Sequence, residues 1–209
     1  MTPGSSRRGL RPAALIAAFV LILAPSKEAA MAQTVDPYAG FAPDALELVR
    51  SSFYRAVDSL AATESAIAAL AARFGPERRS WPLVARAYRA SLEGLVGKHD
   101  PNLLVKFNRV NAALEQWRGL VEAAPDSLEL RFLRYSFHSQ LPAVFGVGSY
   151  LPGDREALIA IFEKGGDARV PRNQALDMVA WLLGEGKLSA PERRRLELAA
   201  AKLQTAGKP

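Results

Sequence analysis

The chain has no cysteine and only two histidines among its 209 residues. Without cysteine there is no thiolate nucleophile, no zinc–thiolate site and no cysteine-ligated iron–sulfur cluster. The two histidines, His99 and His138, lie far apart in the sequence. Neither has a companion at helical ligand spacing such as H-x-x-x-H. The sequence therefore predicts no metal site and no cofactor.

Patterns that belong to known catalytic arrangements are also missing. There is no G-x-S-x-G motif around a serine nucleophile. Ser136 and His138 are two residues apart, so on a helix they point about 160° away from each other and cannot form a dyad. The glycines of Phe145–Gly153 lack the preceding strand and the lysine that a phosphate-binding loop requires. No catalytic residues are predicted, and a non-enzymatic role is favoured.

Charge of a single sign does not gather in any one segment. The formal net charge is +6, with 27 basic and 21 acidic residues. Removal of residues 1–32 would delete four basic residues and one acidic residue, which leaves 23 basic and 20 acidic groups and a charge of +3. A nucleic-acid surface needs clustered Lys and Arg, so nucleic acid is not expected as a partner.

Long apolar runs are absent except at the N-terminus. Arg7, Arg8 and Arg11 precede the apolar run Ala13–Ala24, and Ala30-Met31-Ala32 fits the small-x-small cleavage pattern. These features predict a cleavable signal peptide over 1–32 and an exported, periplasmic or secreted protein. The run of 12 residues is shorter than the about 20 that span a bilayer. A retained anchor is the alternative, and no integral membrane segment is expected after cleavage.

No alternating strand pattern of useful length occurs, whereas apolar residues recur at helical spacing throughout. The sequence predicts an all-α, single-domain bundle of about seven helices over 43–205, with no sheet. Residues 33–42, rich in Pro and Gly, are expected to be flexible, and 206–209 to form a disordered tail. The final helix should begin with the capping box Ser189-x-x-Glu192.

The central helix is predicted near 127–141, opened by Asp126 and Glu129 as a capping box and stopped by Pro142. It carries two apolar faces, which predicts that it is buried in the middle of the domain. One face consists of Leu128, Phe132 and Tyr135, and the other of Leu130, Leu133, Phe137 and Leu141.

An amphipathic helix is predicted from Leu103 to Ala124, antiparallel to the central helix. Within it, Ala113, Trp117, Leu120 and Pro125 are spaced as in the second half of a tetratricopeptide repeat, which the chain resembles over one helical hairpin only. The segment SLELRFLRYSF (127–137), followed by LP and FG, resembles a segment of small exported bacterial all-helical proteins of uncharacterised function. This resemblance implies export and a helical fold.

Arg131, Arg134 and His138 form a narrow polar seam between the two apolar faces of the central helix. Arg can bind an anion through paired donors, and His titrates near neutral pH. The seam and Tyr150, in the loop 143–153, are therefore the candidate ligand-binding residues. The alternative is structural: the seam pairs with Glu129 or other acids, and the loop only covers the core.

Three functions agree with these features. The first is a non-catalytic protein that acts by protein–protein contact in the cell envelope, which requires an exposed apolar patch. The second is a binding protein or enzyme for a small anion or small molecule, with its pocket between the central helix and the loop 143–153. The third, peripheral membrane association, is disfavoured because the polar helix faces carry mixed charge.

Overall fold

The computed structural model describes residues 35–205, so the predicted signal peptide (1–32) and the tail (206–209) lie outside the described residues. Eight α-helices of twelve residues or more, one single-turn helix (α5) and three short 3-10 helices (η1–η3) make up this part of the chain, which contains no strand. The all-α prediction is confirmed. The elements are α1 (Pro43–Ala56), α2 (Leu60–Phe74), η1 (Arg78–Ser80), α3 (Leu83–His99), α4 (Leu103–Trp117), α5 (Leu120–Ala123), α6 (Leu128–Ser139), η2 (Ala143–Phe145), η3 (Val147–Tyr150), α7 (Leu151–Glu163), α8 (Arg172–Glu185) and α9 (Ala190–Thr205).

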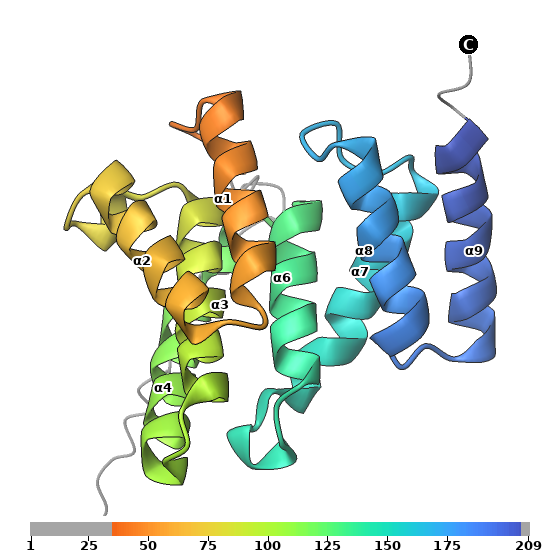
Figure 1. Cartoon of the computed structure of the whole chain (residues 1–209). Coiled ribbons are helices and arrows are strands. Elements are labelled where there is room, and N and C mark those ends of the chain that lie inside the picture. The colour runs from red at the N-terminus through yellow and green to blue at the C-terminus, as the bar shows by residue number, and fades with distance from the viewer. Residues whose placement is uncertain (1–34, 206–209) are drawn as a thin grey trace, which may run out of the picture. The chain divides into compact units, whose positions relative to one another are not determined.

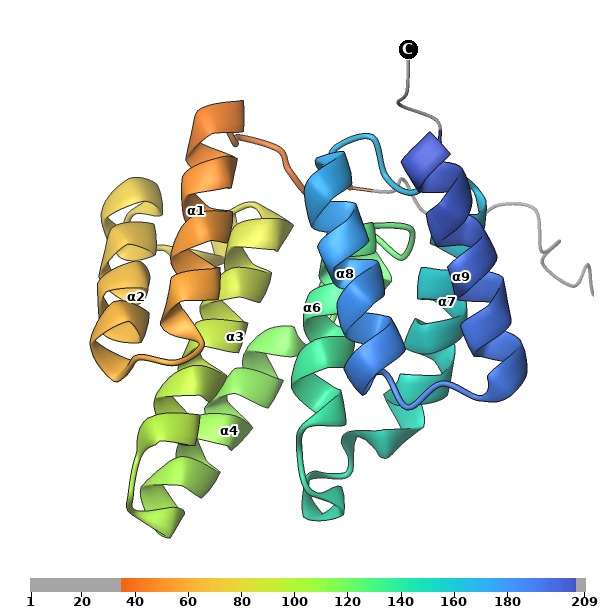
Figure 2. The same ribbon diagram turned by 45° about the vertical axis from the view of Figure 1, so that its right-hand side comes forward.

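The central helix of the fold is α6, as predicted. In both Figure 1 and Figure 2 it stands between α1–α3 on one side and α7–α9 on the other. Its Leu130 and Leu133 belong to the apolar cluster built with α1, α2, α3 and α5. Its opposite face belongs to the cluster built with α7, α8 and α9. This face consists of Leu128, Phe132 and Tyr135. A helix that serves two cores must be apolar on two sides, which is the pattern in the sequence.

The start of α6 differs from the prediction. The N-cap is Ser127, whose hydroxyl accepts a hydrogen bond from the Leu130 backbone N–H, and not Asp126. Glu129 takes no part in a capping box, because its carboxylate accepts hydrogen bonds from Arg50. Serine and aspartate are equally good N-caps, so the local sequence does not decide between Ser127 and Asp126. The bond between Glu129 and Arg50 joins residues 79 positions apart, and no local pattern predicts it.

The close approach of α3 and α6 depends on Gly94. A β-carbon at this position would lie 2.4 Å from Cε2 of Phe137. Real β-carbons do not come this close to a neighbouring atom, so a side chain at Gly94 would require the Phe137 ring to move. The glycine therefore leaves the space in which the Phe137 ring packs against α3.

The predicted helix 103–124 is broken in the structure. The long helix ends at Trp117, and Gly119 adopts a left-handed conformation with φ of 73° before the short helix α5. Glycine adopts this conformation without the steric cost that other residues incur. As a result α4 packs on α3, whereas α6 packs mainly on α3 and α7, so α4 and α6 are not the packed antiparallel neighbours that the sequence predicted.

Residues 35–42 also differ from the expected flexible segment. The Tyr38 side chain is buried, and the Pro37 carbonyl accepts a hydrogen bond of 3.0 Å from the Val84 backbone N–H. The Val35 N–H donates to the Ala123 carbonyl. Proline and glycine here shape a turn that packs against α3 and α5.

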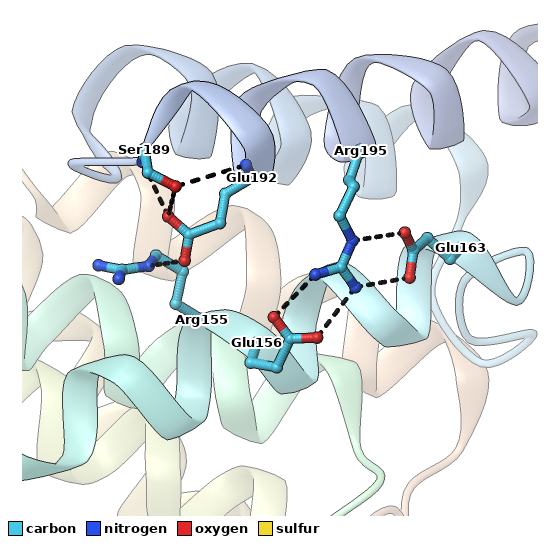
Figure 3. Close-up of polar contacts among 6 residues, drawn as sticks. All are labelled: Arg155, Glu156, Glu163, Ser189, Glu192 and Arg195. Carbon is cyan, nitrogen blue, oxygen red and sulfur yellow. Dashed lines mark hydrogen bonds and ion pairs between the residues drawn. The ribbon is translucent and has the colours of Figure 1, made fainter.

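Polar contacts hold α9 against α7 at the surface (Figure 3). The Arg195 guanidinium donates to both Glu156 and Glu163 at 2.8–2.9 Å, and Arg155 donates to Glu192 at 2.7 Å. Glu192 also accepts from the Ser189 backbone N–H, which completes the predicted capping box. None of the helices in the described range 35–205 combines the length and hydropathy required to cross a membrane.

Candidate functional site

The polar seam of α6 is built on one buried acid. The Arg134 Nε and Nη2 donate to the two carboxylate oxygens of Asp154 at 2.8 and 2.7 Å, and Arg131 Nη1 donates to the same carboxylate at 2.7 Å. Asp154 is completely buried in the first turn of α7. The helix α7 begins at Leu151, and the Asp154 carboxylate binds both arginines of the seam. Glu129 binds neither of them.

Arg134 has a second acidic partner and an aromatic neighbour. Its Nη1 donates to Glu122 of α5 at 2.8 Å, and its guanidinium carbon lies 5.0 Å from the centre of the Tyr150 ring. All three guanidinium nitrogens of Arg134 therefore donate to carboxylates. Arg131 completes its own contacts by donating from Nε to the Pro125 carbonyl at 2.8 Å.

A cavity of about 510 Å³ lies where α4, α5, α6 and the η2–η3 segment face one another. This volume is within the range of small-molecule sites, roughly 300–1,000 Å³. We call it the α4–α6 cavity. Its lining residues come from the end of α4, the break and α5, the seam of α6, and the η2–η3 segment: Asn111, Leu114, Glu115, Trp117, Arg118, Gly119, Glu122, Arg134, His138, Phe145, Gly146, Val147 and Tyr150.

Two of the lining side chains carry buried polar atoms without a hydrogen-bond partner in the described part of the chain. They are both ring nitrogens of His138 and the indole Nε1 of Trp117. Each of these side chains is only 3% exposed. Buried polar atoms in folded proteins are nearly always paired, because an unpaired one costs about 1–3 kcal/mol. Both side chains line the α4–α6 cavity, which makes this cavity the candidate site.

The His138 imidazole is neutral at physiological pH. Burial and, to a smaller extent, the positive charge of Arg134 lower its pKa to about 4, and the carboxylate of Asp154 acts in the opposite direction. A neutral imidazole has one N–H donor and one acceptor nitrogen. Together with the indole N–H of Trp117, the side chains that line the cavity carry two unpaired donors and one unpaired acceptor, each with almost no solvent-accessible area.

Aromatic rings surround these polar atoms. The His138 ring lies 6.4 Å from the Trp117 ring and 5.7 Å from the Tyr150 ring, measured between centroids. At the rim, Phe145 stacks on Phe107 with centroids 5.1 Å apart, which joins the η2–η3 segment to α4. These rings give the cavity flat aromatic surfaces beside its polar and charged lining residues.

The structure thus brings together three of the four candidate residues from the sequence. Arg134, His138 and Tyr150 line the cavity, whereas Arg131 does not and serves to hold Asp154. The sequence did not identify Trp117, which it placed in an apolar stripe, or the acids Glu122 and Asp154. The spacing of Trp117 and His138 along the chain, 21 residues, carries no local signal. Only the break at Gly119 brings the two side chains to one cavity.

Other parts of the described chain offer weaker candidates. A cavity of about 170 Å³ lies between α1 and α2, but none of its lining residues has an unpaired buried polar atom. Within residues 35–205, no group of three or more histidine, aspartate and glutamate side chains is arranged to hold a metal ion. In comparisons with known proteins, no protein-family model, curated protein or solved structure matches this chain.

Proposed function

We propose that this protein is an exported binding protein that takes a small molecule into the α4–α6 cavity. One observation carries the proposal: the cavity is lined by His138 and Trp117, whose ring nitrogens lack hydrogen-bond partners among residues 35–205. The volume supports it, because about 510 Å³ accommodates a one- or two-ring compound. The ion pair between Arg134 and Asp154 also supports the proposal, because it fixes the Arg134 side chain at the cavity wall.

The binding half of the proposal is tested by closing the cavity mouth. Asn111 is exposed on α4 and lines the cavity, so Asn111→Trp would fill the entrance without disturbing the core. Asn108 is exposed on the same helix, one turn earlier, and is not a lining residue. Asn108→Trp is therefore the matched control for the added indole.

The measurement is ligand-observed NMR of the full chain with a set of neutral one- and two-ring aromatic fragments. We expect several fragments to bind the wild type and Asn108→Trp, and none of these to bind Asn111→Trp. If no fragment binds, or if every fragment binds equally well to Asn111→Trp, the cavity is not a ligand site. Circular dichroism of both variants checks that the fold is unchanged.

The export half rests on Arg7, Arg8, Arg11 and the apolar run Ala13–Ala24. We expect the protein recovered from a Gram-negative host's periplasmic fraction to begin at Gln33. Intact-mass measurement of that protein is the test. If the full 209-residue chain is instead recovered in the membrane fraction, the N-terminal segment is not cleaved and acts as a retained anchor.

A second candidate function is contact with a protein partner, favoured by an apolar rim beside the cavity. Leu103, Leu104 and Val144 are 79%, 68% and 74% exposed, and Phe107 is 43% exposed. Phe107 also stacks on Phe145 of the cavity lining, which places it beside the cavity. Exposed apolar groups that gather in one place are typical of interaction sites. Loss of a purified partner's binding in Leu104→Glu, with cavity ligands still bound, would place the partner here.

A further inference from the structure

The apolar rim consists of four exposed side chains from two segments that are distant in the sequence. Leu103, Leu104 and Phe107 lie in the first two turns of α4, and Val144 lies in η2. Figure 1 and Figure 2 both show the start of α4 and the η2–η3 segment at the same end of the described fold. The rings of Phe107 and Phe145 stack with centroids 5.1 Å apart, which connects the two segments directly. The rim is therefore one surface at one end of the fold.

The two segments carry little charge, and the excess is positive. Residues 139–153 contain no charged residue, whereas residues 98–109 contain three basic residues and one acid, Asp100, which gives a net charge of +2. Lys98 Nζ lies 3.9 Å from a carboxylate oxygen of Asp58, and Lys106 forms no ion pair within residues 35–205. The Asp100 carboxylate accepts a hydrogen bond from the Asn102 N–H in the turn before α4. The surface thus combines exposed apolar side chains with a small positive charge.

This combination fits a lipid surface better than a second folded protein. A stable protein interface uses about 20–30 residues on each side, whereas the rim offers four exposed apolar side chains. A peripheral contact with a bilayer needs only a few apolar side chains in the headgroup region and basic groups that attract anionic lipids. The mixed charge of the helix faces disfavours a helix that lies flat on a membrane, but it does not oppose contact through one end of the fold.

We infer that the apolar rim docks on the surface of an anionic lipid bilayer. Leu103, Leu104 and Val144 enter the headgroup region, and Lys98 and Lys106 lie beside the lipid phosphates. This inference goes beyond the proposed small-molecule role and does not depend on it.

Co-sedimentation with large unilamellar vesicles tests the inference. The protein used is the chain that begins at Gln33, because the apolar run Ala13–Ala24 would enter a bilayer on its own and the described fold lies within residues 35–205. Vesicles of equal parts phosphatidylcholine and phosphatidylglycerol provide an anionic surface, and pure phosphatidylcholine vesicles provide a neutral one. We expect the wild type to bind the anionic vesicles about fivefold more tightly than the neutral ones, because the lysines contribute only at a charged surface.

Single substitutions locate the contact. Leu104→Glu removes an apolar side chain of the rim and adds a negative charge, so it should weaken binding to the anionic vesicles about tenfold or more. Leu198→Glu on α9 is the matched control, because Leu198 is 67% exposed, against 68% for Leu104, and lies outside the rim. This control should bind like the wild type. Val144→Glu should weaken binding as Leu104→Glu does, and Lys106→Gln should weaken binding to the anionic vesicles alone, roughly threefold.

The inference is wrong if the wild type stays in the supernatant with both kinds of vesicle, or if Leu198→Glu loses as much binding as Leu104→Glu. It is also wrong if the wild type ignores vesicles but elutes as a dimer that Leu104→Glu separates, since the rim would then join two copies of the chain. Circular dichroism checks the fold of each variant. If the wild type bound vesicles but no aromatic fragment, the proposed function would be lost and this inference would stand.

Discussion

Two polar sites lie on opposite sides of α6, and they differ in whether their buried atoms are paired. At the first, which we call the Glu129 site, the fully buried carboxylate of Glu129 accepts from Arg50 Nε and Nη2 at 2.9 and 2.7 Å and also from the Tyr88 hydroxyl. At the second, the α4–α6 cavity, both nitrogens of His138 and Nε1 of Trp117 have no partner within residues 35–205.

The difference separates a structural site from the proposed binding site. The Glu129 site joins α1, α3 and α6, and Arg50 also donates to the Arg169 carbonyl at 3.1 Å, before α8. The Glu129 carboxylate thus has a donor at both oxygens, although the nearby Tyr38 hydroxyl has no partner in the described residues. The side chains lining the cavity keep two donors and one acceptor unpaired, which costs stability and is the basis of the proposed binding role.

The largest effect should come from Arg50→Met. This change removes the ion pair's cation and leaves the Glu129 carboxylate buried with only Tyr88 as a partner. Loss of one partner of a buried pair costs about 3–5 kcal/mol. Urea denaturation at pH 7 should show this loss, and the folded fraction should bind the aromatic fragments of the α4–α6 cavity test as well as the wild type does.

The double variant Arg50→Met/Glu129→Leu is the control. It replaces both charges by apolar groups, so it should recover much of the lost stability. If the single variant were as stable as the wild type, the Glu129 site would not be the structural site described here.

The fold was largely predictable from the sequence, and the reason is visible in α6. Its two apolar faces, Leu128–Phe132–Tyr135 and Leu130–Leu133–Phe137, recur at helical spacing and match the two cores. The cavity was not predictable in the same way. It depends on the left-handed conformation of Gly119, which interrupts a segment that the sequence predicts as one continuous helix. It also depends on the hydrogen bond between Arg134 and Asp154, which lie 20 residues apart in the sequence. Tertiary pairing of this kind has no local pattern.

The second effect concerns pH and His138. Its pKa in the folded protein, about 4, is below the ordinary value of 6.5, so the unfolded chain binds this proton at a higher pH than the folded one. Stability should therefore fall as pH drops from 6.5 to 4, by about 3 kcal/mol from this group. Urea denaturation at several pH values measures the free energy of unfolding. In His138→Phe this free energy should not show the decrease that protonation of His138 causes, and at pH 7 the variant should be at least as stable as the wild type.

A result in which His138→Phe is clearly less stable at pH 7 would contradict the comparison. It would mean that the His138 nitrogens are already paired, for example through bound water, and contribute to the fold as Glu129 does. Trp117→Phe gives an independent check, because it removes only the unpaired Nε1 of the cavity wall.

The third change, Asp154→Asn, converts the cavity toward a charged site. It leaves Arg131 and Arg134 with one acid, Glu122, in place of two. We expect a loss of about 2–3 kcal/mol, because the amide NH2 of asparagine cannot accept from a guanidinium N–H and at least one hydrogen bond to the arginines is lost. The net positive charge beside the cavity should now favour an anionic aromatic fragment such as 2-naphthoate, and its affinity should rise while that of neutral fragments changes little. If no anion gains affinity, the charge balance does not govern ligand choice.

The smallest effect is expected at the surface contact between α7 and α9, where Arg195 meets Glu156 and Glu163 (Figure 3). This cluster has as many short contacts as the Glu129 site, yet its side chains are 36–57% exposed to solvent. Water already solvates these charges, so their pairing gains little, and salt screens it within about 3 Å at 1 M. Arg195→Gln should therefore lower the melting temperature slightly at low salt and not at all in 1 M NaCl. Arg194→Gln, a neighbouring exposed arginine with no ion pair in the described region, is the matched control. If Arg195→Gln lowered stability as much as Arg50→Met, the number of contacts would determine what an ion pair contributes. If its effect is much smaller, as we expect, burial determines that contribution.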